Sequence, residues 1–307
     1  MSNQMSIAKY QILSQQGGKG KYGGIYIGMS PEGRKVSIKC VTHYSSILEV
    51  LMRKLMTIDN PHVAKVIDVF TQEDGCLYIV REYVEGIDMK SLFTNKSIYR
   101  KVEERKFVQM GISLLDALEE IHALGVIHRD IKPSNIILRC SEGQRPEDMD
   151  FRDVVLIDFE QCSAYPDESG VKSSFALIYS PPEMLLKYNT LVSPSSDLYS
   201  LSITIYHLIM GKTPYTDCNP EILVNLMLTY PMKQPPRMAD DLYNILSRAA
   251  YKEPFRLPPR RLSPSEIERT LRLGVEGRYA TAAQMRYDLE HVGEPFKKLS
   301  WIKNLIS

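Results

Sequence analysis

The first eighty residues alternate apolar and polar positions, a pattern typical of β-strands. Residues 10–41 read as strands interrupted by a glycine cluster and by the turn sequence Pro31-Glu32-Gly33. Residues 45–56 instead repeat apolar side chains at helical spacing, so we expect a helix there. After Asn60-Pro61, two more apolar runs end at residues 77–80 and predict two further strands.

From residue 86 onward the pattern becomes helical. The largely apolar stretch 198–210 predicts a buried helix that stops at Gly211. Further helices are expected at 102–124, 240–250 and 282–291. A chain of 307 residues exceeds the usual size of one core, so two units are expected. The pattern predicts an α+β fold with a small β-rich lobe over residues 1–85, a larger helical lobe over 86–307, and a cleft between them.

Composition and charge narrow the class of protein. Hydrophobic residues make up 44% and charged residues 24%, which is typical of globular proteins. The net charge of +1 provides no general attraction for nucleic acid or an acidic membrane. No apolar run reaches 18 residues, and the first ten residues lack the layout of a signal peptide. The sequence leaves the oligomeric state open.

The cysteines point to a reducing compartment. There are five, an odd number, and none forms a Cys-x-x-Cys pair. This scatter argues against a disulfide framework or a zinc site, so we expect a cytoplasmic location. The five are Cys40, Cys76, Cys140, Cys162 and Cys218.

Three features near the start suggest phosphate binding, each with a simpler alternative. Gly18, Gly20 and Gly23 form G-x-G-x-x-G between two expected strands, which either cradles phosphates or is an ordinary hairpin turn. A dinucleotide-binding motif would need a helix next, but residues 25–27 read as strand. Lys39 ends an apolar strand and either meets solvent or points into the cleft. Glu49, the only acidic residue of the next helix, is either a surface residue or a partner for Lys39.

The strongest signal is the run HRDIKPSN at residues 128–135, which resembles the catalytic loop of eukaryotic-type protein kinases. The run LIDFE at 156–160 resembles their metal-binding DFG motif, with glutamate in place of glycine. The runs PPE at 181–183 and DLYS at 197–200 resemble two later kinase motifs, in forms similar to bacterial members. Arg278 matches a late arginine that pairs with the glutamate at 183. The resemblance covers residues 10–291, nearly the whole chain.

The resemblance implies the bilobal protein kinase fold and magnesium-dependent phosphoryl transfer from ATP to serine or threonine hydroxyls of a protein substrate. Asp130 would orient the acceptor hydroxyl and accept its proton, and Lys132 would neutralise the transferred phosphate. Asn135 and Asp158 would hold Mg²⁺, which prefers oxygen ligands. Such a reaction requires positioning and charge neutralisation rather than covalent chemistry.

The resemblance also implies a nucleotide site in the cleft. Lys39 would hold the α- and β-phosphates, oriented by Glu49 as a further catalytic residue. The glycine loop would cover the phosphates, two isoleucines would enclose the base, a hinge would contact its edge, and an aspartate would bind ribose. These residues are Gly18, Gly20, Gly23, Ile25, Lys39, Glu82, Val84, Asp88 and Ile137.

Three positions depart from the family pattern. Glu160 replaces the DFG glycine, and Ala176 replaces a threonine whose hydroxyl bridges the catalytic aspartate and lysine. Arg81 occupies the gatekeeper position, at the back of the adenine pocket, which is usually uncharged. Because a buried guanidinium needs a partner, we expect Arg81 to pair with Glu160 or Glu49; the alternative is that Arg81 points to solvent or that the gatekeeper position is one residue away.

The segment at 161–179 resembles a kinase activation segment. A phosphoserine there would pair with Arg129, and the alternative is that its serines are ordinary loop residues. They are Ser163, Ser169, Ser173 and Ser174.

Two further functions compete with an active serine/threonine kinase. The three departures favour a pseudokinase, a binding or scaffold module that keeps the fold, whereas the complete charged set opposes it. A small-molecule kinase would share the catalytic aspartate. Such enzymes usually lack the Pro-Pro-Glu, Asp-Leu-Tyr-Ser and late-arginine features, all of which are present here.

Overall fold

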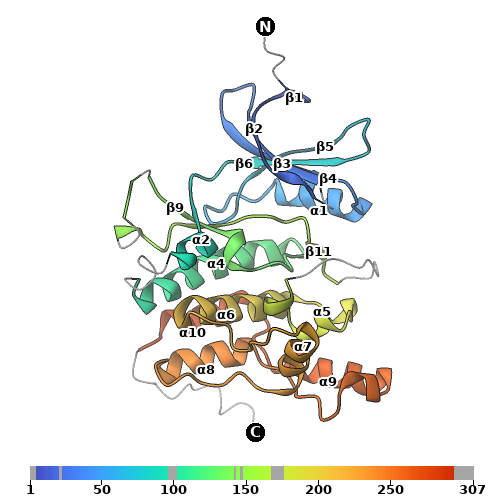
Figure 1. The fold of residues 1–307 in the computed structure, drawn as a ribbon, viewed down its shortest axis with the longest axis vertical. Helices are drawn as coiled ribbons and strands as arrows, with labels where there is room; N and C mark the ends of the chain where they lie inside the picture. The colour runs from blue at the N-terminus through green and yellow to red at the C-terminus, as the bar shows by residue number, and fades with distance from the viewer. Residues whose placement is uncertain are drawn as a thin grey trace.

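The protein has two lobes, as the computed structural model shows for residues 5–20, 23–95, 102–141, 143–145, 148–166 and 176–293 (Figure 1). The N-terminal lobe is a curled antiparallel sheet with strand order β1-β2-β3-β4-β6-β5. Helix α1 (Ser46–Leu55) contacts this sheet at β5. The strands are β1 (Ser6–Ile7), β2 (Tyr10–Gly20), β3 (Gly23–Met29), β4 (Lys35–Val41), β5 (Val66–Thr71) and β6 (Leu77–Glu82).

Strand β4 separates the two faces of this sheet. Successive side chains of a strand point to opposite faces. Val36, Ile38 and Cys40 therefore join the tyrosine-rich cluster on the outer face. Lys39 and Val41 face the other way, and Val41 joins the core beneath the sheet that α1 also enters. The alternation of side chains along β4 thus places Lys39 on the face of the sheet that lines the cleft.

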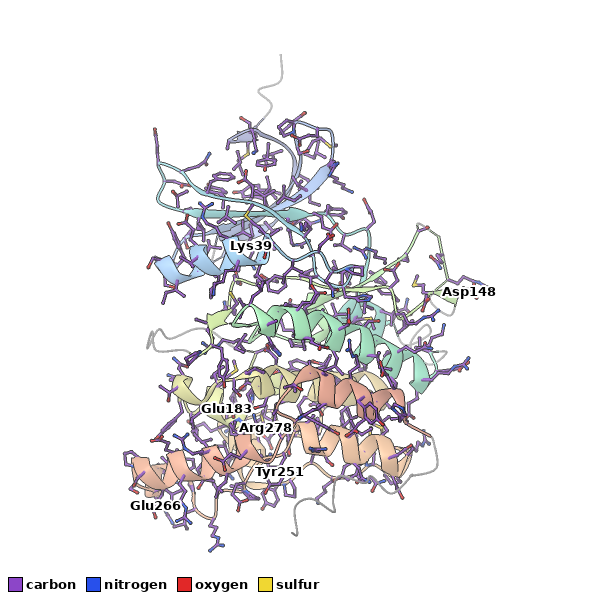
Figure 2. The ribbon with its side chains drawn as sticks, turned by 180° about the vertical axis from the view of Figure 1, so that it is seen from behind. Lys39, Asp148, Glu183, Tyr251, Glu266 and Arg278 are labelled. Atoms are coloured by element: carbon purple, nitrogen blue, oxygen red, sulfur yellow. The ribbon has the colours of Figure 1, made fainter. Side chains whose placement is uncertain are left out.

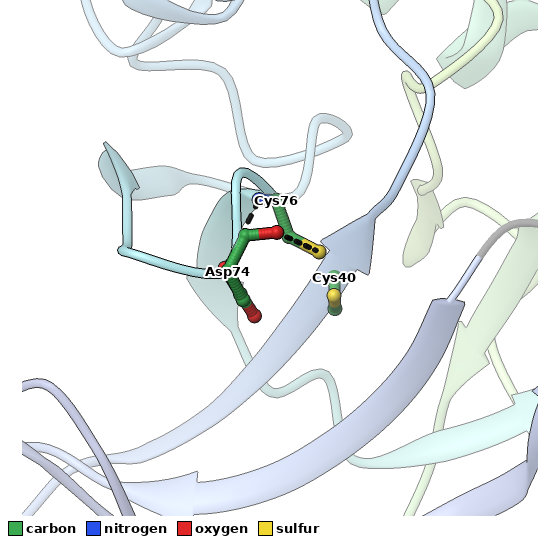
Figure 3. A group of neighbouring side chains, drawn as sticks. All are labelled: Cys40, Asp74 and Cys76. Atoms are coloured by element: carbon green, nitrogen blue, oxygen red, sulfur yellow. Dashed lines mark hydrogen bonds between the residues drawn. The ribbon is translucent and has the colours of Figure 1, made fainter.

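The outer face also brings together groups that are far apart in the sequence. Side-chain ligand atoms of Cys40, Asp74 and Cys76 lie within 4.8 Å of one another (Figure 3). The Asp74 carboxylate already accepts bonds from the Cys76 backbone N–H and, at 2.7 Å, from the Tyr78 hydroxyl. Burial, with Cys40 and Asp74 close by, raises the pKa of the Cys76 thiol to about 12. A thiol that stays protonated is a poor nucleophile, so Cys76 is not expected to react readily.

The C-terminal lobe is built around helix α6 (Pro194–Met210), which is buried along most of its length and contacts α4, α8 and α10. Two small sheets, β10-β9-β7 and β11-β8, lie on the side of the C-terminal lobe that faces the N-terminal lobe (Figure 1). The helices around α6 are α2 (Met89–Thr94), α4 (Glu104–Ala123), α5 (Pro182–Leu185), α7 (Pro220–Thr229), α8 (Asp240–Ala249), α9 (Pro264–Glu276) and α10 (Ala282–Glu290). The short strands are β7 (Gly86–Asp88), β8 (Val126–Ile127), β9 (Ile136–Arg139), β10 (Val154–Leu156) and β11 (Ser163–Ala164).

The α+β fold with a β-rich lobe and a helical lobe confirms the sequence prediction. All strands of the large sheet end by Glu82, and α1 is the one described helix that precedes Met89. The lobe boundary between residues 85 and 86 itself stays a prediction. Among the described parts of the chain, no helix is long and apolar enough to cross a membrane.

Four helices were absent from the sequence prediction, the short α2 and α5 and the longer α7 and α9, and α6 begins four residues earlier than predicted. Helices α6, α7 and α9 each start with a capping residue followed by proline at the first helical position. At α9 the Ser263 and Glu266 side chains form a reciprocal capping box. These start signals were readable in the sequence, whereas the apolar spacing alone was not sufficient.

Candidate active site

The loop at residues 128–135 is held by Asp197, a fully buried carboxylate in the first turn of α6. It accepts bonds of 2.8 Å from the backbone N–H groups of His128 and Arg129, and one of 2.9 Å from His122 Nε2. Burial alone raises the pKa of Asp197, but these donors outweigh burial and leave it lowered. Arg129 adopts a positive φ of 68°, an unusual conformation for a residue with a side chain. The ionised Asp197 therefore fixes a strained loop, as the resemblance implies.

The two carboxylate oxygens of Asp130 differ in their hydrogen bonding. Its Oδ2 accepts from Lys132 Nζ at 2.6 Å and from Asn135 Nδ2 at 2.8 Å. Its Oδ1 is buried and has no hydrogen-bond partner among the described residues. A buried acceptor without a donor is costly, and a hydroxyl entering the cleft would satisfy it. The carboxylate is thus oriented by its neighbours, with one oxygen left for a ligand.

The segments that carry the two expected metal ligands lie side by side. Strands β9 and β10 pair, and the Ile157 backbone N–H donates to the Asn135 carbonyl at 2.9 Å. Asp158 follows directly, with a positive φ of 71°. An amide oxygen and a carboxylate are the hard donors that Mg²⁺ takes. Together with the unsatisfied Asp130 oxygen, this donor set fits a magnesium–phosphate ligand.

Lys39 is enclosed by two carboxylates. Its Nζ donates to both Asp158 oxygens at 2.8 Å and forms an ion pair at 2.8 Å with Glu160 Oε2, which is buried and has no hydrogen-bond partner among the described residues. Burial alone would lower the pKa of Lys39, but the two carboxylates outweigh it and leave the pKa raised. Burial likewise would raise the pKa of Asp158, yet Lys39 holds it lowered. Burial and the Asp158 charge raise the pKa of Glu160, and Lys39 compensates only in part.

The expected Lys39–Glu49 pair is wrong for this structure. Glu49 Oε1 instead accepts from Arg53 Nη2 at 2.7 Å and from Nε at 3.2 Å, one turn further along α1. Arg53 also donates to the Val69 carbonyl of β5, which holds this pair at the edge of the sheet. Glu160 takes the place beside Lys39 that the sequence prediction gave to Glu49.

The expected pairing of Arg81 with Glu160 or Glu49 is also wrong. Among the described residues Arg81 makes no ion pair; its Nη1 donates to the Glu82 carbonyl at 3.0 Å. Burial lowers the pKa of Arg81, and the largest compensation comes from the charge of Asp158. Arg81 lines a small cavity behind Lys39 with the residues Met52, Val66, Ile79, Asp158, Phe159 and Glu160. Glu160 is already engaged with Lys39, so Arg81 relies on Asp158 at longer range.

Two of the residues expected around the base, Val84 and Ile137, share one apolar cluster. Ile25 lies directly opposite Lys39 in the β3–β4 register. Val84 and Ile137 pack in one apolar cluster with Ala64 and Val155. This arrangement places Val84 and Ile137 in contact with a common apolar group, as an adenine-binding wall requires.

The polar residues expected at the nucleotide are partly engaged elsewhere. Asp88 caps α2, accepting from the Ser91 N–H and hydroxyl, so ribose would have to compete with Ser91. The Glu82 backbone N–H donates to the Lys65 carbonyl, and its carboxylate accepts from the Lys65 N–H. The Glu82 carbonyl also accepts from Arg81 Nη1, so a base contacting this hinge residue would have to share that carbonyl.

The glycine loop forms the tip of the β2–β3 hairpin. Gly18 and Gly20 end β2, and Gly20 lies opposite Gly23 at the start of β3, with residues 21–22 outside the described part. A strand rather than a helix follows the glycines, so the dinucleotide-binding alternative is excluded.

Ala176 leaves the catalytic pair without a bridging hydroxyl. Lys132 contacts Asp130 directly, and Ala176 contributes only its carbonyl, which accepts from the Ser180 hydroxyl. Ser163 of the activation segment is buried in β11, which makes it a poor phosphate acceptor. Ser169, Ser173 and Ser174 lie outside the described residues.

A second buried ion pair anchors the C-terminal lobe (Figure 2). Arg278 reaches Glu183 with two parallel bonds of 2.7 and 3.0 Å, as the sequence comparison predicted. Ser196 also donates to Glu183 at 2.7 Å, and Arg278 Nε donates to the Tyr251 carbonyl. Both Glu183 oxygens and all three Arg278 guanidinium nitrogens therefore make hydrogen bonds within the protein.

Two contacts of the site were missed by sequence reasoning. His122 binds Asp197 although 75 positions separate them, and no local signal marks that pairing. The unusual Glu160 was noticed, but its partner is Lys39 rather than Arg81.

Comparison with known proteins agrees with this geometry. The chain is 29% identical to a serine/threonine-protein kinase stk11 homolog of Dictyostelium discoideum, over 78% of this chain and 42% of that protein. It is 27% identical to a 3-phosphoinositide-dependent protein kinase 1 of Arabidopsis thaliana, over 71% and 43%. It is 26% identical to the serine/threonine-protein kinase PkaB of Streptomyces coelicolor, over 86% and 61%. The chain thus spans less than two thirds of the length of each of these relatives.

The model of the protein kinase domain matches residues 11–266, which is most of the chain. The matched range contains Lys39 and residues 128–135 and 156–160. The chain belongs to the protein kinase family.

Proposed function

We propose that this chain transfers the γ-phosphate of ATP to serine or threonine hydroxyls of a protein substrate, with Mg²⁺. The observation that carries the proposal is the state of Asp130. One of its oxygens is fixed by Lys132 and Asn135, and the other is buried without a donor among the described residues. A hydroxyl placed there would be aligned for transfer, and alignment supplies much of the rate in this chemistry. The Lys-Pro-Ser-Asn sequence of this loop supports a serine/threonine acceptor.

The roles of the other residues follow from their positions. Asp158 and Asn135 would hold magnesium, which neutralises phosphate charge when bound. Lys39 would bind the α- and β-phosphates, and Lys132 would offset charge on the transferred group. Ile25 and Ile137 would enclose the base, and the hinge backbone at Val84 would contact its edge. Asp130 Oδ1 would orient the hydroxyl and accept its proton.

A pseudokinase is the second candidate, and one observation favours it. Lys39 and Asp158 are bound to each other, and Ala176 cannot supply the bridging hydroxyl. A phosphate ligand would have to replace part of the Lys39–Asp158 contact. A protein that binds nucleotide without transferring phosphate would fit this arrangement.

Two measurements separate these candidates. We expect MgATP to raise the melting temperature and labelled phosphate to pass from ATP to generic protein acceptors. Binding without transfer, at a rate equal to that of Asp130→Asn, would identify a pseudokinase. The free cysteines support a reducing compartment, so the assay should contain a thiol reductant.

A further inference from the structure

We propose that Glu160 positions Lys39. This is the role that the resemblance to protein kinases gave to Glu49 on α1. The inference rests on the proposed function only where phosphate transfer is measured. It starts from two ion pairs that each use one glutamate. Glu160 lies 2.8 Å from Lys39 Nζ, whereas Glu49 lies 2.7 Å from Arg53 on the helix surface.

The two ion pairs differ in solvent exposure, which determines how strongly their charges interact. The Lys39 and Glu160 side chains are 20% and 13% exposed, whereas those of Arg53 and Glu49 are 56% and 34% exposed. Charges interact more strongly where water is excluded, and exposed pairs contribute little. Of the two glutamates, Glu160 is therefore the one that can orient Lys39, beside the hydrogen bonds that Lys39 makes to Asp158.

The charge balance explains why a second carboxylate is useful at this lysine. In this structure Lys39 contacts both Asp158 and Glu160, so two negative charges share one positive charge. A divalent cation that takes Asp158 as a ligand would remove one of the lysine's partners. Glu160 would then remain as the anchor that keeps Lys39 aimed at the phosphates.

The position of Glu160 in the chain has a mechanical consequence. Glu160 lies two residues after Asp158, so a single short segment holds both the metal ligand and the lysine anchor. Asp158 has a positive φ of 71°, and any movement of this segment would displace both groups together. The alignment of Lys39 would then depend on this segment and much less on where α1 lies.

The first test needs neither ATP nor activity. Nucleotide-free protein is treated with an amine-reactive activated ester, and acylation of Lys39 is followed by peptide mass spectrometry. Acylation requires the amine to leave its carboxylate partners and reach the reagent. Because Glu160 lies 2.8 Å from Lys39 Nζ, Glu160→Gln should partly release the side chain and increase labelling of Lys39 relative to that of Lys35 and Lys132.

The matched control is Glu49→Gln, the same change on α1. It should alter Lys39 labelling by much less than Glu160→Gln does. A Glu49→Gln effect equal to or larger than the Glu160→Gln effect would overturn the proposal. Lys35 and Lys132 serve as internal references, and circular dichroism verifies that each variant is folded.

The second test separates positioning from structural support through steady-state kinetics. Glu160→Gln should raise the KM for ATP and lower kcat/KM for ATP by about tenfold, while the KM for the protein acceptor changes little. Glu160→Asp should recover part of the loss because it keeps the charge. Higher activity in Glu160→Gln than in the parent would instead show that Glu160 inhibits phosphate transfer, and it would overturn the proposal. If the parent transfers no phosphate, the proposed function fails, and the labelling result still decides the role of Glu160.

Discussion

The two ion clusters of the molecule are built on opposite plans. Glu183 and Arg278 form a one-to-one bidentate pair with both side chains at most 1% exposed. In the cleft, Lys39 faces two carboxylates, and a third one, Asp130, keeps an unsatisfied oxygen. Figure 2 shows Lys39 in the upper lobe and Glu183 beside Arg278 in the lower lobe.

The difference shows where the protein needs a partner. A buried pair with all its bonds made stabilises one packing and has no capacity for a ligand. The cleft cluster balances its carboxylates with Lys39, Lys132 and, at longer range, Arg81, but it keeps one open acceptor that only a donor such as a hydroxyl completes. Removing charges from the first cluster should therefore affect folding, and removing them from the second should affect chemistry.

The strongest test of this contrast is Asp130→Asn. Turnover should fall by about 10²–10⁴, the usual loss when a positioned proton acceptor is removed. MgATP affinity should change little, because Asp130 faces the acceptor side. Phosphate transfer and nucleotide titration measure the two effects. Transfer at the parent rate would contradict the assignment of Asp130.

The reciprocal test is Arg278→Met in the buried Glu183–Arg278 pair. It leaves Glu183 buried without its cation, so the free energy of unfolding should fall by about 3–5 kcal/mol. Denaturant titration measures this loss. Glu183→Gln added to Arg278→Met should recover a large part of it, because the uncompensated charge is gone. A double variant no more stable than the single one would show that the loss comes from packing.

A smaller effect with a defined pH dependence is expected for Glu160→Gln. Burial and Asp158 raise the pKa of Glu160 above its unfolded value, so the ionised carboxylate lowers stability at pH 7.5. The variant should therefore melt slightly above the parent at that pH, which differential scanning calorimetry measures. The gain should disappear as the pH falls through the raised pKa and the parent takes up its proton. A gain that grows toward acidic pH would contradict the direction of the pKa shift.

The smallest effect is expected on α1. Glu49→Gln removes a half-exposed pair with Arg53 and should cost about 0.3–0.5 kcal/mol of unfolding free energy. Chemical denaturation at low and high salt measures it, and salt should reduce it. A cost above about 2 kcal/mol would mean that Glu49 pairs inward, as the sequence comparison first suggested.

The sequence was sufficient for the fold and for contacts within motifs. Residues 128–135 are contiguous, so Asp130, Lys132 and Asn135 had to lie close together, and the motif match also predicted the Glu183–Arg278 pair. The partner of Lys39 was not predictable, because it depends on which of two glutamates is nearer after the lobes pack. The Cys40–Cys76 approach was missed for the same reason: 36 positions separate the two, and the β4–β6 register brings them together.

Arg81 gives the cleft a chemical character that matters for inhibitor design. A compound that extends an aromatic group past the adenine position would strip water from a guanidinium whose hydrogen bond goes to the Glu82 carbonyl. A compound that ends in a carboxylate or sulfonamide would instead gain a charged donor behind Lys39. Selectivity for this protein over kinases with an uncharged residue at that position therefore depends on an acidic tail of the correct length.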